Sequence, residues 1–178
     1  MYYADYTEEE ENAICKELKD HTLEKSIIDY TKLRERAHID LDGIKPLSPI
    51  GLKFIEFFIH RELLNTKSKH RISFYDFWFH RDFYMHRDNA TTNLVASIRK
   101  NKPYLTDIKI GKQVFNLYYG SISIFRPTNA AKLYSYLKPS CVLDFTMGWG
   151  GRMVGAAIMN VPKYIGIDMN TRLEEPYK

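Results

Sequence analysis

Residues 141–168 combine two acids with a glycine-rich segment in a spacing that suits ligand binding. The predicted unit is a short apolar strand ending in Asp144, a loop that carries Gly148 and Gly150, and a helix. Such a loop needs glycine because its backbone must turn sharply and approach a ligand without Cβ atoms, while the next helix offers free N–H groups at its N-terminus. A second predicted strand leads into Asp168, about twenty residues after the loop, where an acid can hold ribose hydroxyls.

The glycine pattern argues against a nicotinamide or flavin dinucleotide. Those sites favour G-x-G-x-x-G, whereas the third place here is Met153. The order Asp144-x-x-x-Gly148-x-Gly150, followed by Asp168, instead resembles motif I and the next acid of class I S-adenosylmethionine-dependent methyltransferases.

Two neighbouring segments extend this resemblance over residues 121–173. Residues 125–130, Phe-Arg-Pro-Thr-Asn-Ala, look like the motif that precedes motif I in amino-type DNA methyltransferases and helps to hold the methionine end of the cofactor. Residues 145–152 are similar to the "DPFAGWGGR" loop of phage, bacterial and large-virus methylases, with Phe145 and Thr146 in place of the usual Pro-Phe.

The resemblance implies an S-adenosylmethionine site. Asp144 and the loop backbone would face the methionine moiety, and Asp168 would take the ribose. The implied cofactor-binding residues are Phe125, Pro127, Thr128, Asp144, Phe145, Thr146, Gly148, Gly150, Asp168 and Met169. We expect no metal ligand and no catalytic residue among them.

The implied family reaction is methyl transfer to an exocyclic amine of a DNA base, N6 of adenine or N4 of cytosine, which requires the base to be flipped out of its stack. The family's Asp/Asn/Ser-Pro-Pro-Tyr/Phe motif has no counterpart here, because a single proline, Pro176, precedes Tyr177 and lies too early. We therefore expect the cofactor-binding N-terminal part of a longer enzyme, inactive alone. The alternatives are a noncatalytic DNA-binding or structural protein that retains a relic loop, and a fragment of an RNA methyltransferase.

The elements expected to position this site are mixed α and β. The fold class is α/β: a helical N-terminal region, a small β-meander, and the first β-α-β of a truncated Rossmann-like methyltransferase sheet. Helices are expected at residues 8–20, 23–37, 50–64, 89–100, 127–137 and 152–160, and strands at 105–110, 114–119, 121–125, 141–144 and 163–167. We expect one domain over residues 1–101 and a second over 102–178. The open edge of so short a sheet predicts a partner, either a missing catalytic half or a second copy of the chain.

The middle of the chain is basic and aromatic, which permits nucleic-acid binding. Candidate contacts to DNA, or to RNA, are Arg71, Arg81, Arg87 and Lys100. The aromatic run Phe74, Tyr75, Phe77, Trp78, Phe79, Phe83 and Tyr84 fits a core, with base stacking as the alternative. The histidine spacings are not those of a compact metal site.

Composition limits the class of protein. Apolar residues make up 44% of the 178-residue chain and its net charge is +4, as expected for a folded, mildly basic protein. Because there is no long apolar run and the first residues do not form a signal peptide, we expect an intracellular protein without a membrane span. Cys15 and Cys141 are expected to be buried, reduced thiols.

Overall fold

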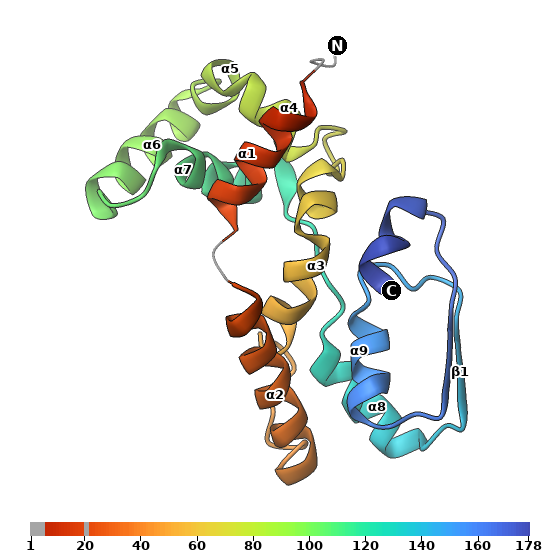
Figure 1. Cartoon of the computed structure of the whole chain (residues 1–178). Helices are drawn as coiled ribbons and strands as arrows, with labels where there is room; N and C mark the ends of the chain where they lie inside the picture. Colours follow the sequence, from red (N-terminus) through yellow and green to blue (C-terminus); the bar gives the residue numbers. More distant parts are fainter. Residues whose placement is uncertain (1–5, 20–21) are drawn as a thin grey trace. The chain divides into compact units, whose positions relative to one another are not determined.

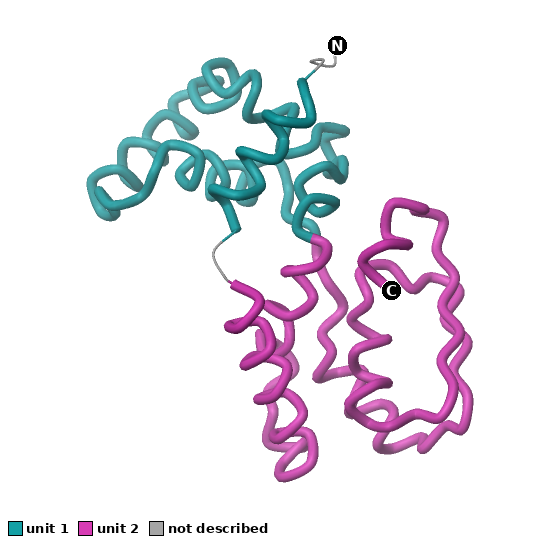
Figure 2. Tube along the Cα trace, viewed as in Figure 1, with its two compact units in different colours: residues 1–20, 60–122 teal, residues 21–59, 123–178 magenta. Residues whose placement is uncertain are grey.

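The computed structural model describes residues 6–19 and 22–178, and it is mostly helical with one small sheet (Figure 1). The chain forms two compact units, each built from two segments (Figure 2). Unit 1 contains residues 1–20 and 60–122, and unit 2 contains residues 21–59 and 123–178. The expected boundary after residue 101 thus falls inside unit 1.

The elements follow one another in a simple order. They are α1 (Glu8–Leu18), α2 (Leu23–Ile39), α3 (Leu52–Asn65), α4 (Phe74–Phe79), α5 (Arg81–Met85), α6 (Asn89–Asn101), α7 (Asp107–Val114), the π-helix η1 (Phe115–Gly120), α8 (Pro127–Leu137), β1 (Cys141–Asp144), α9 (Gly151–Ile158), β2 (Lys163–Gly166), and the 3₁₀ turns η2 (Thr171–Leu173) and η3 (Glu175–Tyr177).

Side-chain caps fix the start of several helices. Thr7 and Glu10 form a capping box at α1, in which each side chain accepts a hydrogen bond from the other residue's backbone N–H. Ser73 does the same with Asp76 at α4, and Asp88 caps α6. The helices expected near residues 8, 23, 50 and 89 are confirmed, although α3 starts two residues late, at Leu52.

Unit 1 is organised around an aromatic core. Phe74, Tyr75 and Phe77 are fully buried and pack with Phe115 and Tyr119. The core interpretation of the aromatic run is thus confirmed for these three rings, whereas Phe83 on α5 is 64% exposed.

The β-meander expected over residues 105–125 is wrong. This segment forms α7 and η1, and residues 121–126 are extended without pairing. Ile108, Ile110 and Val114 reach the core at helical spacing. Gly111, taken as a turn residue, instead allows close packing, because a Cβ there would lie 3.0 Å from the Trp78 ring.

The expected pair of buried thiols is also wrong. Cys141 is exposed at the start of β1, and Cys15 on α1 is only half-buried. Both are free cysteines.

Unit 2 contains the sheet that the sequence predicted. β1 and β2 pair in parallel, with Cys141 opposite Lys163 and Asp144 opposite Gly166. Helices α8 and α9 pack together, and α2 contacts both. Their shared apolar cluster is formed by Ala130, Tyr134 and Ala156.

The ends of α8 follow directly from the sequence. Pro127 occupies the first turn, where its missing N–H costs nothing. Lys138 adopts the left-handed conformation, with φ of 48°, and Pro139 prevents the helix from continuing. Strands β1 and β2 and helix α9 form a parallel β-α-β unit, with the glycine loop at the carboxyl end of β1.

Within the described ranges, no helix is both long and apolar enough to cross a membrane.

Candidate functional site

The loop between β1 and α9 has the backbone shape that its glycines predict. Gly148 and Gly150 both have positive φ, 58° and 77°, a conformation that L side chains rarely adopt. The Gly150 N–H donates to the Met147 carbonyl at 3.4 Å, which closes the turn before α9. Met147 is buried beneath β2, and a Cβ on Gly166 would collide with its sulfur. The sequence analysis missed the packing of Met147 against Gly166. The signal that could have indicated it is Met147 itself, an apolar residue inside a glycine loop.

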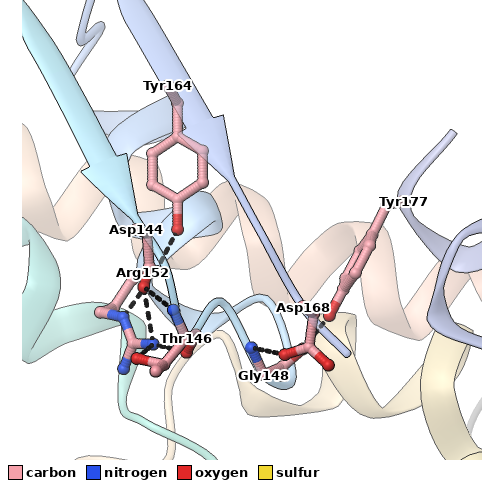
Figure 3. Close-up of polar contacts among 7 residues, drawn as sticks. All are labelled: Asp144, Thr146, Gly148, Arg152, Tyr164, Asp168 and Tyr177. Carbon is pink, nitrogen blue, oxygen red and sulfur yellow. Dashed lines mark hydrogen bonds and ion pairs between the residues drawn. The ribbon is translucent and has the colours of Figure 1, made fainter. Parts of the chain in front are cut away.

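Asp144 holds the start of the loop together (Figure 3). The Arg152 guanidinium donates to both carboxylate oxygens, at 2.6 and 3.0 Å, and the Thr146 N–H donates to Oδ1 at 3.2 Å. The Tyr164 hydroxyl donates to Oδ2. Burial raises the pKa of the Asp144 carboxyl, but these hydrogen bonds outweigh burial and leave its pKa below the ordinary value. The carboxylate is therefore ionised and engaged by its own chain.

Arg152 connects this carboxylate to the rest of the loop. Its guanidinium also donates to the Thr146 carbonyl, and it lies 5.3 Å from the centre of the Phe125 ring. Hydrogen bonding to Asp144 raises the pKa of Arg152. Sequence reasoning did not single out Arg152 or Tyr164, because nothing local ties them to Asp144.

Asp168 reaches the other side of the loop from the carboxyl end of β2. Its Oδ2 accepts from the Gly148 N–H at 2.7 Å, and its Oδ1 accepts from the Asn170 N–H at 2.8 Å. The structure thus brings the second predicted acid against the glycine loop, twenty positions away along the chain.

Tyr177 covers the loop from outside, as Figure 3 shows. Its hydroxyl donates to the Gly148 carbonyl, and a Cβ on Gly150 would lie 3.3 Å from its ring. Burial, followed by the nearby carboxylates of Asp168 and Asp144, raises the pKa of Tyr177 to about 12. The phenol is therefore a neutral donor at physiological pH, and it lies against the loop at Gly148 and Gly150.

The beginning of α8 packs closely against α9. A Cβ on Gly151 would collide with the Phe125 carbonyl, and one on Gly155 would lie 3.0 Å from the Pro127 carbonyl. Thr128, in the first turn of α8, is fully buried. Among the described side chains, its Oγ1 is one of the few buried polar atoms without a hydrogen-bond partner.

Two of the implied cofactor residues do not join this arrangement. Phe145 and Met169 project outward, with exposures of 74% and 98%. Thr146 engages Arg152 and Asp144 through its backbone.

No family model, curated protein or solved structure matches this chain. The site must therefore be interpreted from its own chemistry and from the motif resemblance.

The four candidate nucleic-acid contacts all lie in unit 1 and are exposed, but they do not gather in one place. Arg87 lies over the Tyr119 ring, at 5.3 Å, and Arg71 belongs to a turn next to that ring. Arg81 instead lies over Trp78, at 4.9 Å, and Lys100 is in the last turn of α6. In residues 6–19 and 22–178, no cluster of three or more His, Cys, Asp or Glu side chains could hold a metal ion.

Proposed function

We propose that unit 2 binds S-adenosylmethionine through residues 145–150 and Asp168, as the cofactor-binding part of a nucleic-acid amino-methyltransferase with DNA as the expected substrate. The observation that supports this most is the 2.7 Å contact from the Gly148 N–H to Asp168. It joins a glycine loop and an acid at the carboxyl ends of two adjacent parallel strands, which is where open α/β sheets bind ligands.

The residues present fit the two ends of this cofactor. Asp168 is a suitable acceptor for ribose hydroxyls, and it would exchange its present backbone hydrogen bonds for them. The starts of α8 and α9 lie against each other, and helix N-termini favour a carboxylate such as that of the methionine end. The buried Thr128 hydroxyl beside them lacks a partner among the described atoms, and it supplies a further polar group there.

The bound cofactor would supply an activated methyl group for transfer to a base amine. This chain's own residues would bind and orient it. Asp144 would act indirectly, because its carboxylate fixes Arg152 and the loop backbone in place. The sequence holds no Pro-Pro-Tyr type motif, so we assign no catalytic residue to these 178 residues.

A second candidate is a noncatalytic protein that keeps the loop as a scaffold. The observation that favours it is the closure of the loop by its own chain, since Asp144 is fully engaged and Tyr177 lies on the Gly148 carbonyl.

Calorimetric titration of the full chain with S-adenosylmethionine tests these proposals. We expect measurable binding that is lost in Asp168→Ala and retained in Asp82→Ala, a control that removes an exposed acid from unit 1. Circular dichroism of each variant checks that the fold persists. If the folded wild-type chain does not bind, or if Asp168→Ala binds equally well, the cofactor proposal is wrong and the scaffold proposal gains.

A further inference from the structure

We propose that two turns of unit 1 form a binding surface for the phosphate backbone of a nucleic-acid duplex. The surface, which we term the Tyr119 cationic surface, consists of Lys69, His70, Arg71 and Arg87. The sequence singled out Arg71 and Arg87, and the structure brings the two turns that carry them, which α4 and α5 separate along the chain, to the same ring.

The two turns meet at Tyr119. The His70 ring approaches Tyr119 edge-on with centroids 6.0 Å apart, and the Arg87 guanidinium lies 5.3 Å from the Tyr119 ring centre. The Lys69 Cγ lies 3.6 Å from the point where Gly120 would carry a Cβ. All four members of the surface are exposed, and the Tyr119 ring that supports them is buried.

The backbone at Arg71 adopts a conformation that is unfavourable for a residue with a side chain. Residues 68–72 form a tight turn, in which the Ser68 N–H donates to the Ile72 carbonyl and the Arg71 N–H donates to the Ser68 carbonyl, both at 2.9 Å. Arg71 has a φ of 61°, where glycine or asparagine is favoured and an arginine is strained. Strain of this kind persists mainly where function requires it. An exposed guanidinium at a position better suited to glycine points to a ligand for that guanidinium.

Arg87 is held in a defined geometry. It donates two hydrogen bonds to Asp88, at 3.0 and 2.9 Å, and Asp88 in turn caps α6 through the Thr91 N–H. Asp88 offsets the charge of Arg87, and Lys69 and Arg71 add two further positive charges to the surface.

The chemistry of this surface favours a phosphate backbone. Clustered Arg and Lys on turns bind phosphate oxygens without regard to sequence. Base stacking does not fit, because Tyr119 is 2% exposed and its hydroxyl donates to the Tyr84 carbonyl at 3.0 Å. Membrane-surface binding typically uses an amphipathic helix, whereas these cations lie on turns. The choice of nucleic acid as the polyanion rests on the proposed function. The surface itself lies in unit 1, whereas the proposed cofactor site lies in unit 2.

Fluorescence anisotropy of a labelled DNA duplex, titrated with the full chain over a salt series, tests the proposal. We expect dissociation constants of about 10⁻⁴ to 10⁻⁶ M that depend little on DNA sequence. The slope of log binding constant against log salt should decrease by roughly 1 in Lys69→Ala and in Arg71→Gly. Lys16→Ala is the matched control, since it removes an exposed lysine of α1 that belongs to neither turn.

Arg71→Gly separates binding from folding. Because glycine relieves the strain at this position, the variant should unfold at the same temperature as the wild type or about 2 °C higher, even though it binds DNA more weakly. Equal losses in Lys69→Ala and Lys16→Ala would overturn the proposal, as would no duplex binding at low salt, or binding to phosphatidylserine vesicles but not to the duplex. Cofactor titration of the same samples reports on unit 2 alone, so failure of this surface is distinguishable from failure of the cofactor site.

Discussion

Replacing Tyr177 by alanine should make the glycine loop bind S-adenosylmethionine more tightly. The phenol donates to the Gly148 carbonyl and its ring lies against Gly150, so a ligand on the loop must displace it. The lost hydrogen bond is worth about 1 kcal/mol. Roughly 50 Å² of apolar ring area returned to water adds about 1 kcal/mol. Together these oppose binding by about 2 kcal/mol, or roughly 30-fold in Kd.

Calorimetric titration of three chains measures this effect. Tyr177→Ala should bind roughly 30-fold more tightly than the wild type. Tyr177→Phe keeps the ring and loses only the hydroxyl, so it should gain roughly fivefold. Weaker binding in Tyr177→Ala would refute the reasoning, because it would mean that the ring forms part of the ligand site and does not compete with the ligand.

Three further predictions concern stability and reactivity. Gly155→Ala forces a methyl group into the contact between α8 and α9, so it should lower the free energy of unfolding by about 1–3 kcal/mol. Ala157→Ser, at an exposed position of the same helix, should change that free energy little. Thermal melts of both variants measure the difference. The lowered pKa of Asp144 stabilises the fold above the unfolded Asp pKa of about 3.9, and this stability is lost as pH falls through the folded pKa. Urea unfolding between about pH 6 and pH 2 should therefore show a flatter profile for Asp144→Asn. Iodoacetamide should alkylate exposed Cys141 roughly tenfold faster than Cys15, whose pKa is raised by burial; mass spectrometry that finds equal rates would contradict this.

Local signals predicted the elements whose ends are decided locally. Thr7 and its following acids marked the start of α1, and Pro127 with Pro139 bracketed α8. The strand, glycine loop and helix of unit 2 were likewise readable, because the positive φ at Gly148 and Gly150 requires their residue type.

Tertiary contacts decided the rest. The alternating apolar residues near Ile108 suited a strand as well as a helix, and only packing of Gly111 against Trp78 distinguishes the two. Nothing in the sequence connects Tyr177 with Gly148, since their contact spans 29 positions and depends on where two turns place the end of the chain. The partners of Asp144 were missed for the same reason.

The division of each unit into two distant segments has a consequence for the order of folding. Helix α2 must wait for α8 and α9, its partners in unit 2, and these emerge from the ribosome about ninety residues later. Meanwhile the second segment of unit 1 is synthesised and can close its aromatic core with α1. Contacts so far apart in sequence slow folding through the entropy of loop closure. Unit 1 should therefore complete its core first, while the part of α2 that contacts α8 and α9 stays exposed until those helices have been synthesised, which makes that part a candidate for binding by a chaperone.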